Sequence, residues 1–326
     1  MMENEIQASA APEPPAVEPA AVPAQAPALS DAALARRSGL WTLGVGLGYL
    51  LFWQIVQRIP SGDGRLILAT TLISLGITLL FTVCAARSLR SPLALGLCLG
   101  VAALLVLPSL LPFMVRAFPQ WAVWGTLAPF YKSYRRAYHA VPGLDGLLLI
   151  LLAVGLGVLV SRLVREFKIL LPMAIALALV DLYVVFGGGL VTQAQSGKAP
   201  VAQAAMQALT VQLPTVQPKT GAAPMQLAVG FADFLFIALF FACFARFEIP
   251  ARKTFYVLCA VLMAYMVIVF LTNWALPALV PIAVVIIGMN LRRFRYERSE
   301  AFALLYAGLI LAAVVAVFYF LNGRHK

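Results

Sequence analysis

Apolar runs recur along the chain between residues 40 and 321, and each run is separated from the next by a shorter polar or charged segment. A helix needs about 20 predominantly apolar residues to cross a hydrocarbon core of about 30 Å. The pattern therefore predicts an all-α, polytopic membrane protein with about nine transmembrane helices. We expect these spans at 40–57, 66–84, 93–115, 147–161, 169–187, 225–245, 254–272, 274–291 and 301–321.

Composition supports the same class of protein. Hydrophobic residues make up 62% of the 326 positions and charged residues only 11%, whereas a soluble domain is about half apolar and a quarter charged. The formal net charge of +11 would suggest a nucleic-acid partner in a soluble chain. Here the basic residues gather in short segments between spans, so we interpret the charge as membrane topology and expect no nucleic-acid partner. The distribution favours a cytoplasmic N-terminus and an external 188–224 loop.

Three regions follow from these patterns. Residues 1–38 are rich in Ala and Pro and lack the basic start and apolar core of a signal peptide, so we expect a disordered tail. Residues 39–165 hold the N-terminal transmembrane helices. Residues 166–326 form a transmembrane region that contains the candidate catalytic residues Asp181 and Asp233. Between two spans, 210–217 alternates apolar and polar residues, which is typical of a strand, although an unstructured loop fits equally. The segment 121–130 is too short to cross and is expected to be interfacial or re-entrant.

The cysteine and histidine residues do not indicate a metal site. Cys84, Cys98, Cys243 and Cys259 lie in apolar spans without the short spacing of a metal site, and the chain has only two histidines. We therefore expect neither a metal nor an organic cofactor.

Two acidic residues stand out because they lie inside apolar runs. Of the 13 acidic residues, only Asp181 and Asp233 do so, and a carboxyl at the centre of a membrane helix costs about 2.5 kcal/mol or more. Counting from the ends of their consecutive spans, the two residues lie roughly 9 and 12 Å below the same membrane surface. No Lys or Arg occurs in either run, so the natural partner of each carboxyl is the other.

Two carboxyls in one low-dielectric site cannot both ionise easily, and the pair is expected to hold a single proton. An aspartic protease uses this state: one carboxylate takes a proton from water while the protonated partner donates to the peptide carbonyl. Proton or cation transport uses buried acids as well. A purely structural role is the third alternative, and composition does not separate them.

The surrounding residues resemble a known family. Gly230-Phe231-Ala232-Asp233 is similar to the glycine-x-glycine-aspartate motif of presenilin and the signal peptide peptidases, which are intramembrane aspartyl proteases. The run VDLYVVFG around Asp181 resembles the span with their first aspartate. Pro277-Ala278-Leu279 is similar to their Pro-Ala-Leu motif, and the order and spacing of all three elements match. The run RFEIP after the second acid favours signal peptide peptidase. The resemblance covers roughly residues 170–291.

The resemblance implies a water-mediated, two-aspartate hydrolysis of transmembrane peptides. Asp181 and Asp233 would be catalytic. Gly230, Phe231, Ala232, Pro277, Ala278 and Leu279 would line the substrate site. Pro277 and Pro281 remove backbone donors and should kink or unwind the eighth span.

The chain departs from the family's pattern at two motif positions. Ala232 replaces the second glycine and Val180 replaces a common tyrosine. The spans also differ, with one fewer before Asp181 and one more after the Pro-Ala-Leu segment. A catalytically inactive relative that binds transmembrane helices is therefore an alternative, and a proton- or cation-coupled transporter is the other.

The expected topology bears on substrate and location. An external 188–224 loop is the orientation associated with signal peptide peptidases, which would favour type II segments or signal-peptide remnants. The short chain without large soluble inserts suggests a prokaryotic cytoplasmic membrane. Expected partners are transmembrane peptides and the lipid bilayer, while a homo-oligomer and an accessory subunit both stay open.

Overall fold

The computed structural model describes residues 31–59, 63–106, 141–187, 206, 208–216, 228–272, 276–294 and 302. Several predictions lie outside these residues: disorder in 1–30, the interfacial segment 121–130, most of the 188–224 loop and, apart from residue 302, the ninth span.

The described part is mostly helical, which confirms the predicted class of secondary structure. Its principal helices are α1 (Asp31–Gln57), α2 (Gly64–Ser88), α3 (Pro92–Val106), α6 (Leu144–Ser161), α7 (Leu170–Leu182), α10 (Phe231–Arg246), α11 (Arg252–Thr272) and α12 (Leu279–Asn290). Each overlaps one of the first eight predicted spans. Short 3-10 helices lie at Phe167–Ile169 and Leu291–Arg293, and a π-helical turn at Tyr183–Gly187 extends α7.

Five helical segments of the described chain are long and apolar enough to cross a membrane. They are Ser38–Gln57, Gly64–Ser88, Leu144–Ser161, Phe167–Val185 and Arg252–Thr272. By contrast α3, α10 and α12 have 15, 16 and 12 residues, fewer than the roughly 20 that a perpendicular span needs. The count of nine spans therefore stays a prediction.

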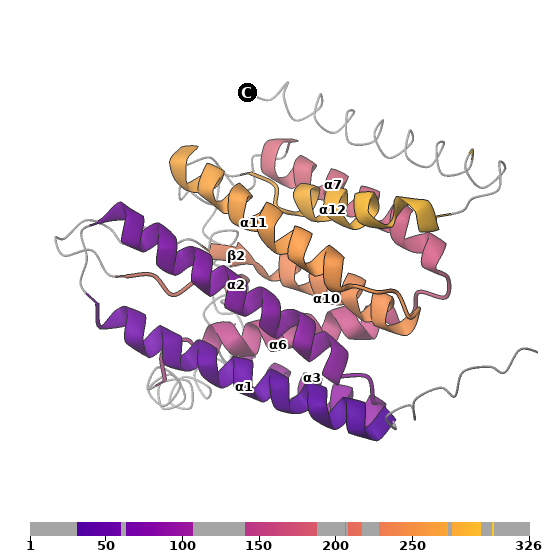
Figure 1. Ribbon diagram of the computed structural model, residues 1–326, viewed down its shortest axis with the longest axis horizontal. Coiled ribbons are helices and arrows are strands. Elements are labelled where there is room, and N and C mark those ends of the chain that lie inside the picture. Colours follow the sequence, from indigo (N-terminus) through magenta and orange to yellow (C-terminus); the bar gives the residue numbers. More distant parts are fainter. Residues whose placement is uncertain are drawn as a thin grey trace, which may run out of the picture.

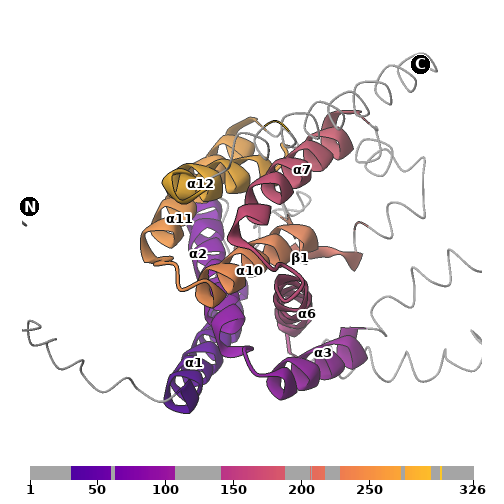
Figure 2. The same ribbon diagram turned by 90° about the vertical axis from the view of Figure 1, so that its right-hand side faces the viewer.

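Helix α10 lies at the centre of the fold. Figures 1 and 2 show α2 and α10 between the group α7, α11 and α12 on one side and α1, α3 and α6 on the other. The residues of α10 are apolar around most of the helix, as expected for a helix enclosed by others. One face, with Phe240, Phe241 and Phe244, packs into a cluster with α2, α7, α11 and α12. The opposite face, with Phe234 and Ala238, packs into a second cluster with α2, α3 and α6.

A glycine sets the distance between α6 and α10. A Cβ at Gly157 would collide with the Leu235 carbonyl oxygen and lie 3.0 Å from both the Ala238 Cβ and the Leu239 nitrogen. Only a residue without a side chain allows the two backbones this approach. At the end of the same helix pair, the Arg246 guanidinium donates to the carbonyls of Ser161 (3.0 Å) and Val164 (2.9 Å). The glycine and the arginine together fix α10, and with it Asp233, against α6.

A two-stranded antiparallel sheet precedes α10. β1 (Thr210–Gln212) pairs with β2 (Ala228–Gly230), with Val211 opposite Val229. The strand-like period of 210–217 thus gives a strand over its first three residues. The prediction that a helix begins at 225 is wrong, because β2 occupies 228–230 and α10 starts only at Phe231. The Phe231 N–H donates to the Leu209 carbonyl at 2.9 Å, so pairing with β1 holds the backbone extended up to the helix.

Two further boundaries differ from the sequence-based expectations. Helix α1 begins at Asp31, so residues 31–38, which we assigned to the disordered tail, are helical; this stretch is rich in Ala, Leu and Arg, which favour helix. Helix α12 begins at Leu279, after a non-helical Pro277, as the prediction of an unwound segment requires. Pro281 does not break α12, because it lies in the first turn, where the missing N–H has no intrahelical partner.

Candidate functional site

Asp233 is the third residue of α10. The Gly230 N–H, at the end of β2, donates to its Oδ2 at 3.2 Å. An acidic side chain at this position satisfies a backbone donor at the helix start and faces the positive end of the helix dipole. The strand-to-helix junction therefore holds the carboxyl in place.

Asp181 is the penultimate residue of α7 and reaches a different helix. Its Oδ2 accepts the Leu279 N–H at 2.8 Å, and Leu279 is the first residue of α12. The first N–H groups of a helix have no partner within the helix, so Asp181 caps α12 from another part of the chain. This bond joins the first aspartyl segment to the Pro-Ala-Leu segment, 98 positions further on.

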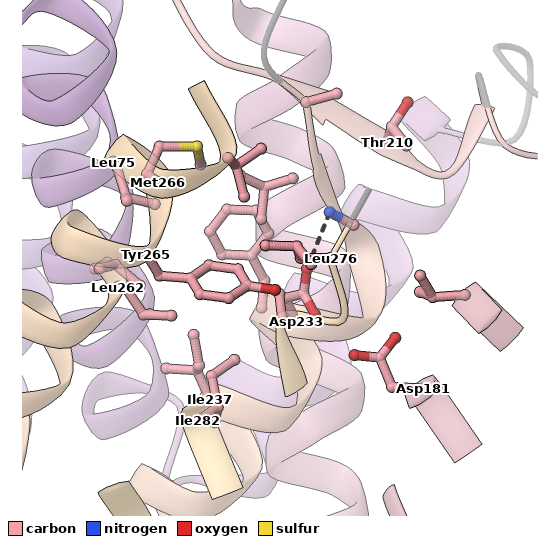
Figure 3. A pocket seen from close by; sticks show the side chains of 18 of the residues that line it. Leu75, Asp181, Thr210, Asp233, Ile237, Leu262, Tyr265, Met266, Leu276 and Ile282 are labelled. Carbon is pink, nitrogen blue, oxygen red and sulfur yellow. Dashed lines mark hydrogen bonds between the residues drawn. The ribbon is translucent and has the colours of Figure 1, made fainter. Parts of the chain in front are cut away.

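Both carboxyls face one cavity of about 440 Å³ (Figure 3). Its walls come from α2, α7, both strands, α10, α11 and α12 and are mostly apolar. The lining residues are Leu75, Leu79, Asp181, Val185, Met206, Thr210, Ala228, Val229, Gly230, Asp233, Phe234, Ile237, Leu262, Tyr265, Met266, Val269, Leu276, Ala278 and Ile282. The bundle thus brings the two acids together from helices that are far apart in sequence.

The other predicted site residues take different positions. Gly230 and Ala278 line the cavity, and Leu279 holds Asp181 through its backbone. Phe231, Ala232 and Pro277 are not among the lining residues. Phe231 packs against the second cluster, Ala232 is exposed in the first turn of α10, and Pro277 is buried before α12. Ala232 has a negative φ, since Glu248 alone among the described non-glycine residues has a positive one. The methyl group of Ala232 therefore meets neither a close helix approach nor a strained backbone.

The charge balance of the cavity is unusual. Within the described chain, the lining contains two acidic residues and no Lys, Arg or His. The positive ends of two helices face the acids instead, α10 at Asp233 and α12 at Asp181. A helix N-terminus is equivalent to roughly half a positive charge, so this arrangement suits one negative charge better than two. The geometry thus favours a pair that shares one proton.

Sequence reasoning missed two polar residues of this region. Tyr265 in α11 lines the cavity, and Figure 3 shows its hydroxyl pointing toward Asp233. Ser74, buried in α2, donates to the Pro214 carbonyl at 2.9 Å and so fixes the segment after β1. Both lie in the middle of apolar runs, the same signal that identified the two acids.

The described residues contain no group of side chains that could hold a metal ion. Among them, no three His, Cys, Asp or Glu side chains gather at one place. Comparisons with protein-family models, curated proteins and solved structures give no match to this chain.

Proposed function

We propose that the chain is an integral membrane protein that hydrolyses transmembrane peptides with Asp181 and Asp233 as a catalytic pair. The observation that carries the proposal is the shared cavity: two carboxyls from separate helices face one mostly apolar space without a basic residue in its described lining. Residues of all three sequence elements that resemble the intramembrane aspartyl proteases line this cavity: Gly230 and Asp233 of the first, Asp181 of the second and Ala278 of the third.

The outer surface supports the membrane assignment. Leu40, Leu43, Leu47 and Leu51 of α1 are each more than 60% exposed. They follow one another at helical spacing, so a continuous stripe of large apolar side chains covers one side of the helix. Such a face suits contact with lipid. We propose that the three shorter helices and the region after residue 300 complete about nine spans in a prokaryotic cytoplasmic membrane.

The pair performs the reaction through four proton transfers, two as water adds to the carbonyl and two as the C–N bond breaks. The ionised carboxylate takes a proton from a water whose oxygen bonds to the substrate carbonyl carbon. The protonated partner gives its proton to the carbonyl oxygen, which yields a neutral gem-diol. The C–N bond then breaks as the amide nitrogen takes a proton from the first carboxyl, and a gem-diol proton returns to the second. The products are a carboxylic acid and an amine, and the pair regains its single proton.

The walls next to the acids suit an extended substrate. A helical peptide shields its carbonyls, so it must unwind before water attacks. β2 and the non-helical Leu276–Ala278 stretch border the same cavity, and extended backbones can bind a peptide by strand addition. The volume of about 440 Å³ exceeds by far the ~30 Å³ that one water occupies in the liquid. The cavity therefore has room for the attacking water beside a substrate carbonyl.

Cleavage of labelled transmembrane peptides by the purified protein in liposomes tests the proposal. We expect wild type to cut and Asp181→Asn and Asp233→Asn each to lose ~10⁴-fold or more in rate, because removal of one member of a catalytic unit costs about as much as removal of all. Asn keeps the oxygen that accepts the Leu279 or Gly230 N–H, so each variant should melt like wild type.

Two results would count against hydrolysis. Equal cutting by wild type and both variants would point to a contaminating protease. If wild type cuts nothing but carries a proton or cation flux that both variants lose, the two acids serve transport instead.

A further inference from the structure

The Tyr265 hydroxyl is a buried polar group in the wall of the cavity. The oxygen is buried and, among the described residues, finds no hydrogen-bond partner, whereas most buried side-chain polar atoms in proteins have one. The ring lies on α11 with Leu262 and Met266 beside it in the wall of the cavity. The position suggests that the partner is a molecule that enters the cavity.

The direction of the hydroxyl narrows the choice of partner. Figure 3 shows it pointing toward Asp233, whose Oδ2 accepts the Gly230 N–H. Asp181 lines the same space. A substrate carbonyl placed between the two acids therefore lies within the region that the hydroxyl faces.

The chemistry of the group fits one task. A tyrosine hydroxyl is a neutral donor at ordinary pH, and it adds no charge to a cavity that already holds two acids. In the hydrolysis, negative charge develops on the substrate carbonyl oxygen before the proton from the acidic carboxyl arrives. A fixed donor aimed at that oxygen stabilises the transition state more than the ground state.

We infer that the Tyr265 hydroxyl donates a hydrogen bond to the carbonyl oxygen of the scissile peptide and holds it through the tetrahedral intermediate. The inference rests on the proposed hydrolysis and adds a third catalytic residue to the two acids. It assigns α11, in which the sequence motifs place no site residue, a direct part in the reaction.

The test compares Tyr265→Phe with Tyr256→Phe in the liposome cleavage assay. Tyr256 lies on the same helix but is 58% exposed and does not line the cavity, so it controls for loss of a hydroxyl. Removal of one oxyanion donor lowers kcat by about 10²–10³-fold in a protease. We expect a loss of about 10²-fold for Tyr265→Phe, a KM near that of wild type, and wild-type kinetics for Tyr256→Phe. 3-Fluorotyrosine at position 265 keeps the O–H and should restore most of kcat.

Four results would overturn the inference. If Tyr265→Phe has the same kcat as Tyr256→Phe, the Tyr265 hydroxyl does not stabilise the transition state. The proposed hydrolysis by the two acids is not affected by that result. A raised KM with unchanged kcat assigns the hydroxyl to ground-state binding. If wild type does not cleave at all and the Asp→Asn variants behave like it, the proposed function falls first and this inference with it. Should Tyr265→Phe fail to fold, a low kcat with 3-fluorotyrosine in a folded protein would contradict the proposal equally.

Discussion

The two carboxyls of the candidate pair sit in unlike surroundings. Asp233 lies in the first turn of α10, whose side chains from Phe234 to Phe244 are largely buried between two apolar clusters. Asp181 lies in the last turn of α7, of which only Leu170 and Ala174 are buried, and its neighbour Leu182 is 40% exposed. The buried core thus encloses the helix that carries Asp233, whereas the helix that carries Asp181 packs against the core on one side and its carboxyl accepts the Leu279 N–H. Helix α7 is therefore the less enclosed side of the site.

The largest effect should come from matched leucine truncations in the two helices. Leu239→Ala in α10 empties a fully buried position and should lower the free energy of unfolding by about 2–5 kcal/mol, the range for buried leucines. Leu182→Ala in α7 removes an exposed side chain and should cost about 0.5 kcal/mol or less. Unfolding in detergent, followed by circular dichroism, measures both. Similar costs would refute the contrast between the helices.

A smaller effect should follow from removal of the two capping interactions. Asp181→Ala leaves the Leu279 N–H without its acceptor, and Asp233→Ala does the same to the Gly230 N–H. Loss of a helix cap costs about 0.5–2 kcal/mol. The Asn variants keep an acceptor oxygen, so each Ala variant should be less stable than its Asn counterpart by about that amount. Equal stability of Ala and Asn at position 181 would show that the bond to α12 does not hold α7.

The smallest effect concerns the departure from the glycine motif at Ala232. Because its methyl group is exposed in a helical turn, Ala232→Gly should relieve no clash and should cost up to about 1 kcal/mol through helix propensity alone. Ala69→Gly, at an exposed position within α2, is the matched control and should cost a similar amount. A gain in stability for Ala232→Gly alone would mean that the native site needs a glycine there.

Much of this arrangement could be predicted from the sequence, because it depends on local signals. The apolar runs predicted the helices, and the two acids inside them identified the candidate pair. Pro277 indicated the break before α12. The start of α10 could not be predicted, because pairing with β1, distant in sequence, keeps 228–230 extended. The place of Tyr265 in the cavity wall depends on the rotation of α11 about its axis, and packing sets that rotation.

The most direct test of the paired aspartates is photolabelling by a peptide inhibitor with a hydroxyl isostere of the tetrahedral intermediate. The hydroxyl of such a compound replaces the attacking water between the two carboxyls, so it should bind only where both are present. We expect wild type to be labelled, and Asp181→Asn and Asp233→Asn each to lose the label while the melting temperature is kept. Label retained by Asp181→Asn, or no label on folded wild type, would contradict the account.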